Sequence, residues 1–369
     1  MAVGSRLRLL RQRWRVYAGM VRAARSGRVV PLVCDLFITT RCNGLCNYCY
    51  RDDTITAEQE LTTAQWVAVI DDLHAMGCRM FNLMGGEPLL REDFEEILDH
   101  IVSKNVLCDV NTNGFLAPKH LDALKRAGQI FTSLDGDEES HDRNRGKGTF
   151  RKALDGIIAA REAGIPVRVN CTVTRFSAQK IDYLVQLAER HNLFLTFTPL
   201  IRVRESRRSR AAELEMSDAE AKTAFARIKQ AKKRTRRIMN SDASLDFFIN
   251  YPVPFGQIVW RSESDTPHGQ YYNQPCPYGR LQFFIISNGD VFACHNLWNE
   301  PGLKPMNVIR DGTREAIAAT NEALKCRFCW LANLVEWNEF TSPAWLLKGA
   351  YMTLRQLLTW RQRPCAMCE

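Results

Sequence analysis

The sequence lacks the features that would place it in a membrane or on a secretory route. No apolar run reaches the ~18 residues that a membrane-spanning helix needs, and no uninterrupted apolar stretch follows the basic N-terminus as in a signal peptide. Long repeats and low-complexity segments are also absent. The chain has 369 residues, 46% of them hydrophobic, which is enough for a sizeable core. We expect a soluble, cytoplasmic protein of about two domains.

Acidic residues are missing from residues 1–33, which contain eight arginines. The net charge of the chain is +9, so the remainder is nearly neutral, at about +1 by subtraction. A basic amphipathic helix is predicted by apolar residues at helical spacing: Leu7, Leu10, Trp14, Tyr17 and Val21. Such a helix could lie on an anionic membrane or touch RNA, or its apolar side could cover the core.

A disulfide framework is a poor explanation for the 13 cysteines, because a chain without a secretory signal indicates a reducing cytosol. Three of them, Cys42, Cys46 and Cys49, form the run CNGLCNYC. A zinc site would need a fourth Cys or His nearby, and the next candidates, His74 and Cys78, lie beyond a helix-like stretch. Three thiolates can instead hold a four-iron cluster and leave one iron open to an exchangeable molecule.

Short β-rich runs alternate with helical stretches from residue 34 to about residue 231, which is typical of parallel β/α units. The predicted strands are Cys34–Thr40, Met80–Met84, Leu107–Asn111, Ile130–Leu134, Val167–Val173 and Leu193–Thr198. The predicted helices are Thr62–Met76, Arg91–Ser103, Lys119–Ala127, Phe150–Ala163, Gln179–His191 and Ser217–Lys232. Right-handed crossovers place the C-terminal end of every strand at one rim, so the cysteine loop should share that rim with the other strand-end loops.

Polar and glycine-rich turns follow several of these strands. The second strand runs into MGGEP, Met84–Pro88, where two glycines let a ligand approach the backbone and Glu87 supplies an acceptor for a cation. The third and fourth strands end in NTNG, Asn111–Gly114, and SLDG, Ser133–Gly136, and the fifth passes through Asn170. Short amides and hydroxyls can hydrogen-bond a ribose and a carboxylate, but they also favour capping and turns.

A second group of cysteines follows where the β/α alternation stops, after Lys232. A strand, an Asn-Gly turn and another strand predict a hairpin between Cys276 and Cys294, and the CxxC of Cys326 and Cys329 follows a helix-like stretch. Four thiolates can close a second cluster, and zinc on the same thiolates is the alternative, because spacing alone does not tell iron from zinc.

The CNGLCNYC run, with Tyr48 before its last cysteine, and the GGEP turn one strand later resemble the radical S-adenosylmethionine (SAM) superfamily. In that family the amine and carboxylate of SAM chelate the open iron, and the reduced cluster splits SAM to a 5′-deoxyadenosyl radical that takes a hydrogen atom from the substrate. The resemblance implies an α/β fold, an open six-unit partial β/α barrel followed by a small hairpin-plus-helix auxiliary domain. It also implies contacts with SAM by Tyr48, Gly85, Gly86, Glu87, Pro88, Asn113, Ser133 and Asn170.

The second cysteine group is similar to the SPASM and Twitch extensions of the superfamily, in which a glycine such as Gly289 falls shortly before the cysteine that Cys294 matches. A full SPASM domain has a further cysteine where this chain has Val335. We therefore expect one auxiliary 4Fe-4S cluster, held by Cys276, Cys294, Cys326 and Cys329. The expected domains are 1–33, the barrel 34–235, the auxiliary domain 236–335, and 336–369, an amphipathic helix with a CxxC tail.

The stretch Asp137–Phe150 resembles a segment with a His-Asp pair and an Arg-Gly found in radical SAM enzymes that carry extra clusters. Asp135 and His141 could exchange a proton near the rim, whereas Asp142 and Arg145 could brace the loop against one another. The resemblance implies an electron donor such as flavodoxin or ferredoxin.

Oxidation or crosslinking of a peptide or small natural product is the first expectation for the substrate. No leader-binding winged helix is evident in the short N-terminal extension, which leaves a lipid or carbohydrate at a membrane surface open. RNA is a weaker alternative because no dedicated RNA-binding domain is evident. A non-catalytic metal-binding protein is the remaining class, and it would lack SAM cleavage.

Overall fold

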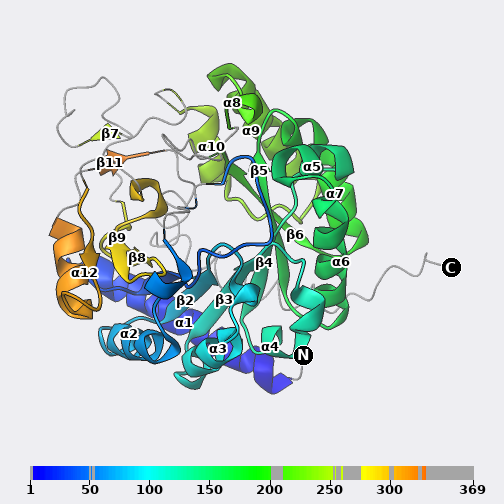
Figure 1. The fold of residues 1–369 in the computed structure, drawn as a ribbon. Helices are drawn as coiled ribbons and strands as arrows, with labels where there is room; N and C mark the ends of the chain where they lie inside the picture. Colours follow the sequence, from blue (N-terminus) through cyan, green and yellow to red (C-terminus); the bar gives the residue numbers. More distant parts are fainter. Residues whose placement is uncertain are drawn as a thin grey trace.

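The fold is built around one curved, mostly parallel sheet. The computed structural model describes residues 3–49, 51, 55–200, 211–251, 254, 259–260, 276–298, 303–322 and 326–329. Within this part, the strand order of the main sheet is β10-β9-β8-β1-β2-β3-β4-β5-β6 (Figure 1). The first six strands lie in chain order, and each neighbouring pair among them is parallel: β1 (Val33–Phe37), β2 (Met80–Met84), β3 (Leu107–Thr112), β4 (Gln129–Ser133), β5 (Val167–Val173) and β6 (Phe194–Pro199).

Helices lie outside the curved sheet and connect its strands (Figure 1). They are α2 (Thr63–Ala75), α3 (Phe94–Ser103), α4 (Leu121–Leu124), α5 (Glu138–Arg145), α6 (Thr149–Glu162), α7 (Ile181–Arg190), α8 (Ala211–Leu214), α9 (Asp218–Arg234) and α10 (Asp242–Ile249). The start of α2 shows how the sequence sets a helix boundary. The Thr62 side chain accepts a hydrogen bond from the Gln65 backbone N–H, and the Gln65 side chain accepts one from the Thr62 backbone N–H, so two backbone donors are satisfied.

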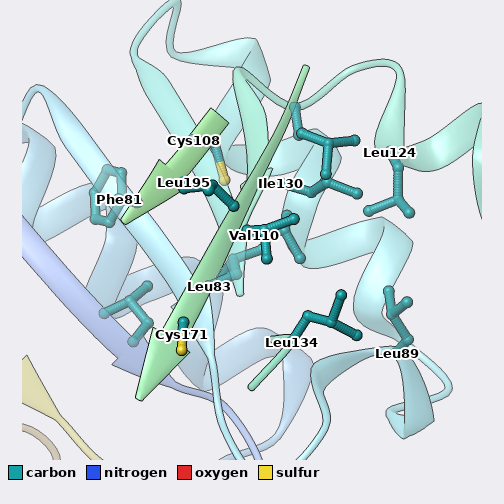
Figure 2. Close-up of a cluster of buried hydrophobic side chains, with 14 of the residues drawn as sticks. Phe81, Leu83, Leu89, Cys108, Val110, Leu124, Ile130, Leu134, Cys171 and Leu195 are labelled. Carbon is teal, nitrogen blue, oxygen red and sulfur yellow. The ribbon is translucent and has the colours of Figure 1, made fainter. Parts of the chain in front are cut away.

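The core lies between the sheet and these helices. Figure 2 shows apolar side chains from neighbouring strands, including Leu83, Val110 and Ile130, together with Leu124 of α4. Four of the cysteines outside the two candidate clusters are at most 2% exposed, which confirms that they are ordinary core residues: Cys34, Cys78, Cys108 and Cys171.

The open six-unit barrel is confirmed. The strands β6 and β10 end the main sheet and do not pair with each other in the described part of the chain. The strand prediction was right for β2 and β5 to the residue. The helix expected at Lys119–Ala127 was too long, because a 3₁₀ turn occupies Ala117–Lys119 and α4 spans only Leu121–Leu124. The helix α5 was not predicted, since its eight residues are almost all polar or charged and have no apolar period.

The hairpin after residue 276 continues the sheet of the barrel. Its strands β8 (Gln282–Ile285) and β9 (Asp290–Phe292) are antiparallel, and Gly289 in the turn has a φ of 89°, a conformation that favours glycine. The strand β8 pairs in parallel with β1, and β9 pairs with β10 (Met306–Asn307) ahead of α12 (Thr313–Glu322). The strands β7 (Val259–Trp260), before the hairpin in the chain, and β11 (Cys326–Phe328), after it, form a separate antiparallel pair (Figure 1).

The N-terminal helix α1 (Val3–Ser26) covers the N-terminal ends of the strands. One buried cluster joins its apolar residues to the start of β1 and β3 and to the residue before β8: Leu9, Val16, Met20, Ala23, Val33, Leu107 and Leu281. The expectation that the helix packs on the core was therefore correct. The expected apolar face was wrong, because Trp14 of that face is 63% exposed and the buried residues of the helix lie on a different stripe. No helix in the described ranges has the length and apolar character needed to cross a bilayer.

Candidate active site

The cysteine loop follows β1 at the C-terminal rim of the sheet, as predicted. Cys42, Cys46 and Cys49 are all partly exposed there. The loop rests on α5, because the Asn47 backbone N–H donates to the Asn144 carbonyl over 2.9 Å and the Asn47 Nδ2 donates to the Arg143 carbonyl over 2.7 Å. Three accessible thiols are thus presented on one anchored loop.

These thiols suit a cluster better than a single ion. Among the described side chains, no three His, Cys, Asp or Glu residues gather closely enough to hold one metal ion. A four-iron cluster takes each cysteine on a different iron and does not need that convergence. Burial raises the pKa of Cys46 to about 11, against the lowering effect of Arg145, and burial also raises the pKa of Cys42. Ligation needs thiolates, so loading the site should release protons.

A buried ion pair holds the cysteine loop against the sheet. Arg145 donates from Nε to the Asp135 Oδ2 over 2.7 Å, and its guanidinium lies 5.2 Å from the centre of the Tyr48 ring. The Tyr48 hydroxyl donates to the same Oδ2 over 2.6 Å, while the Thr172 backbone N–H donates to Oδ1 over 3.0 Å. Arg145 Nη1 also lies 3.9 Å from the Cys46 sulfur. One carboxylate therefore ties the loop, α5 and β5 together.

This carboxylate is fixed in its ionised form. Asp135 is 0% exposed, and burial alone would favour its neutral form, but the Arg145 guanidinium and the hydrogen bonds from Arg145 and Tyr48 outweigh burial and keep its pKa below the ordinary value. Buried charges are stable only when paired in this way. The geometry makes Asp135 a positioning residue, whereas the sequence suggested proton exchange.

His141 is buried behind the same residue. Its Nδ1 accepts the Asp135 backbone N–H over 3.1 Å, and burial lowers the pKa of the ring to about 4, so the imidazole is neutral at pH 7. The proposed brace between Asp142 and Arg145 was wrong. Arg145 pairs with Asp135, and Asp142 instead accepts the backbone N–H groups of Gly148 and Phe150, over 2.6 and 2.9 Å.

The GGEP turn packs directly on the start of the cysteine loop. A Cβ added to Gly85 would lie 2.5 Å from the Thr39 carbonyl oxygen, and one added to Gly86 would lie 2.3 Å from the Arg41 carbonyl oxygen. Only glycine leaves room for this contact. Pro88 is buried and opens the short turn Pro88–Leu90 that follows.

The buried Glu87 carboxylate accepts hydrogen bonds from other residues of the protein. It accepts the Thr112 hydroxyl over 2.8 Å and the Asn113 backbone N–H over 2.7 Å, both from the end of β3. Burial raises the pKa of Glu87 to about 7 although these hydrogen bonds favour the ionised form. The Asn113 Nδ2 in turn donates to the Asn43 Oδ1 over 2.7 Å, next to Cys42. The carboxylate thus connects the GGEP turn, β3 and the cysteine loop.

Two further predicted contacts lie side by side. Ser133 and Asn170 are partners in the register of β4 and β5. Both are partly buried, and the Asn170 Nδ2 donates to the Thr198 hydroxyl over 3.2 Å. Their shared position at the rim gives a ligand adjacent hydroxyl and amide groups.

The second cysteine group is only partly described. Cys294 is 5% exposed and packs with Tyr278 and Leu297, and Cys276 lies against the same cluster. The Asn296 Nδ2 lies 3.8 Å from the Cys329 sulfur. Cys326 begins β11, but its side chain is outside the described part, as are Val335 and the predicted helix and CxxC tail beyond residue 336. The auxiliary cluster stays a prediction.

Sequence reasoning missed the residues that connect the motifs. Thr112, Asn43 and Thr172 join strands and loops that are far apart in the chain. The only sequence signal for them is their place at a strand end or beside a cysteine.

Parts of this chain are similar to known proteins. Residues 36–188 match the profile of the radical SAM superfamily. The Fe-coproporphyrin III synthase of Methanosarcina barkeri is 34% identical over 42% of this chain and 40% of its own length. The mycofactocin maturase MftC of Mycobacterium ulcerans is 28% identical over 79% of this chain and 76% of its own length. The chain spans less than half the length of the first curated relatives that it matches.

A solved structure shares the fold over a larger part. Streptococcus suis SuiB bound to the precursor peptide SuiA has a TM-score of 0.61 and 14% identity, covering 84% of this chain and 73% of SuiB. At this identity the likeness concerns the fold alone. The family assignment rests on the profile match, which is to the Radical SAM superfamily and covers residues 36–188.

Proposed function

We propose that the protein is a radical SAM enzyme whose Cys42, Cys46 and Cys49 hold a 4Fe-4S cluster. The observation that carries the proposal is the hydrogen-bonded link between the cysteine loop and the GGEP turn: Asn43, next to Cys42, accepts from Asn113, and Asn113 donates to Glu87. A cluster bound there would supply the electron that cleaves SAM to methionine and a 5′-deoxyadenosyl radical, which abstracts hydrogen from an unactivated carbon. A flavodoxin or ferredoxin would deliver that electron.

The chain's own residues orient the reactants. The Asp135–Arg145 pair fixes the loop beside Tyr48, and the close packing of Gly85 and Gly86 on Thr39 and Arg41 fixes the GGEP turn beside the same loop, where the turn would hold the SAM ammonium. Ser133 and Asn170 provide hydroxyl and amide groups for the ribose or carboxylate of SAM. Because Asp135 is buried and paired, this site does not depend on a carboxylic acid at that position for proton transfer.

We infer an auxiliary 4Fe-4S cluster on Cys276, Cys294, Cys326 and Cys329. Cys276 and Cys294 lie against one buried cluster, and Cys329 lies beside Asn296, two residues after Cys294. Such a cluster would assist oxidation or crosslinking by accepting an electron from the substrate or anchoring it. Zinc on the same thiolates is the competing occupant.

A peptide is the substrate class that the comparisons support best. The MftC relative is named a maturase, another relative is the sporulation killing factor maturation protein SkfB of Bacillus subtilis, and SuiB was solved with a precursor peptide. In the described part of the chain the sheet stays open between β6 and β10, and an open barrel would suit a large substrate such as a peptide. We therefore propose modification of a peptide or peptide-derived natural product.

The test is anaerobic reconstitution with iron and sulfide, followed by SAM and a strong reductant. The protein should form 5′-deoxyadenosine, and the Cys46→Ala variant should not. Cys108→Ala is the matched control, since it removes a buried thiol away from the loop and should keep the product. Full product formation by Cys46→Ala would rule out the assignment of this cluster.

Metal content tests the auxiliary site separately. About eight irons and eight sulfides per chain are expected for two four-iron clusters, and about four of each would favour zinc or no metal at the second site. Cys294→Ala should lower the iron content by half and still cleave SAM without turning over the substrate. Unchanged iron in Cys294→Ala would exclude it as a ligand.

A further inference from the structure

The helix α1 carries a surface that the packing of the barrel does not use. The helix repeat turns about 100° per residue, so its exposed arginines fall in one arc of roughly 120°. This basic arc consists of Arg8, Arg11, Arg15, Arg22 and Arg25, all exposed. The buried stripe that contacts the sheet lies on the opposite side of the helix: Leu9, Val16, Met20 and Ala23. The basic arc therefore points away from the barrel, except that Arg15 Nη1 reaches the Asn105 carbonyl oxygen over 3.5 Å.

A second apolar stripe borders the basic arc. It consists of Leu10, Trp14 and Val21, none of which belongs to the buried clusters of the described residues. Trp14 is 63% exposed and stacks on Tyr17, with 5.8 Å between ring centres. An exposed tryptophan beside a row of arginines matches a partner that offers both apolar and anionic groups.

The arginines of the arc are not neutralised within the described structure. None of the five forms an ion pair with a described residue, and no acidic residue occurs in positions 1–33. Elsewhere on the surface, arginines such as Arg126 and Arg151 are paired with nearby glutamates. The charge on α1 is thus available to an external anion.

We propose that the outer face of α1 docks on an anionic lipid bilayer. Tryptophan prefers the boundary between headgroups and acyl chains, and each basic residue near an anionic leaflet adds about 1 kcal/mol of attraction. Single-stranded RNA binding instead uses a groove with several aromatic platforms for successive bases. This surface is a convex helix with one strongly exposed ring, which favours the bilayer.

Docking in this way orients the active site away from the lipid. The buried stripe of α1 contacts Val33 and Leu107, the first residues of β1 and β3, at the N-terminal ends of the strands. The cysteine loop and the GGEP turn follow the opposite ends of β1 and β2. A docked enzyme would present its rim to the aqueous side, where a soluble peptide can reach it, so the bilayer is an attachment surface rather than the substrate.

The experiment is sedimentation of the full chain with vesicles. The native protein should pellet with vesicles of phosphatidylcholine and phosphatidylglycerol, pellet far less with phosphatidylcholine alone, and be released by high salt. Replacing Arg11, Arg22 and Arg25 together by Gln should weaken binding on the order of 100-fold, from about 1 kcal/mol for each basic residue. Trp14→Ser should weaken it without changing its salt dependence.

A charge-matched control uses Lys125, Arg151 and Arg310, which are exposed on other elements, each changed to Gln. This variant should bind like the native protein. All variants change exposed residues. The urea unfolding midpoint shows whether each variant is folded, and formation of 5′-deoxyadenosine is an independent check. Equal pelleting of the α1 and control variants would overturn the proposal. The proposal would also be overturned, in favour of RNA, if the native chain failed to bind vesicles but retained RNA in a salt-sensitive way and the α1 variant lost that retention.

Discussion

The Asp135→Asn substitution tests whether one buried carboxylate holds the cysteine loop in place. The change keeps the size of the side chain but leaves the Arg145 guanidinium, 11% exposed, without its counter-charge. Removing one partner of a buried ion pair costs about 3–5 kcal/mol of folding stability. The Tyr48 and Thr172 donors would also lose their charged acceptor. We expect a loss in that range in anaerobic urea unfolding.

A double-mutant cycle separates the pair from general damage. Arg145→Met alone should also destabilise, and adding it to Asp135→Asn should cost clearly less than the sum, because no unpaired charge is left. Glu138→Gln is the control, since its partner Arg151 is 74% exposed and such surface pairs contribute about 0–1 kcal/mol. A loss below about 1 kcal/mol for Asp135→Asn would refute the reasoning.

The pH dependence of this pair has a definite sign. The pKa of Asp135 lies below its ordinary value of 3.8 in the folded protein. Its contribution to stability is therefore complete above that ordinary value and is lost as the pH falls through the lower folded value. The stability difference between native protein and Asp135→Asn should be constant near neutrality and shrink only in acid.

Three further outcomes follow from the site. Glu87→Gln should make the free energy of unfolding less dependent on pH between 4.5 and about 7. Because folding raises the pKa of Glu87 from 4.5 to about 7, the native protein should lose stability relative to the variant as the pH rises through this interval, which urea titrations measure. Gly156→Ala should lower folding stability by about 1–3 kcal/mol, because its Cβ would lie 1.9 Å from the Gly114 carbonyl oxygen and displace the NTNG turn. The displaced turn should also weaken SAM binding in equilibrium dialysis, and unchanged affinity would contradict this. Gly86→Ala should reduce the iron retained after desalting by displacing the Arg41 backbone, and native iron content would contradict it.

The strands of the barrel were predictable because their apolar residues form short β-branched runs between turn residues. β2 and β5 were placed to the residue, and the Asn-Gly turn correctly indicated the hairpin. The pairing of β8 with β1 could not be read from the sequence, since it joins segments about 250 residues apart through backbone hydrogen bonds that any side chains allow.

The chemistry-bearing residues of the site were likewise easier to predict than their partners. The cysteine spacing and the GGEP turn are local patterns, and both lie at the rim as expected. The pairing of Arg145 with Asp135 depends on how α5 folds back over β4, and α5 itself has no apolar period. The buried stripe of α1 was misjudged because the helix carries two apolar stripes, and only tertiary packing decides which one is buried.

The most direct test of the account is electron paramagnetic resonance of the anaerobically reduced protein with and without SAM. We expect the signal of a reduced 4Fe-4S cluster that changes shape when SAM is added, and that is absent in the variant in which Cys42, Cys46 and Cys49 are all alanine. A reduced protein whose signal is indifferent to SAM, or unchanged in that variant, would contradict the account.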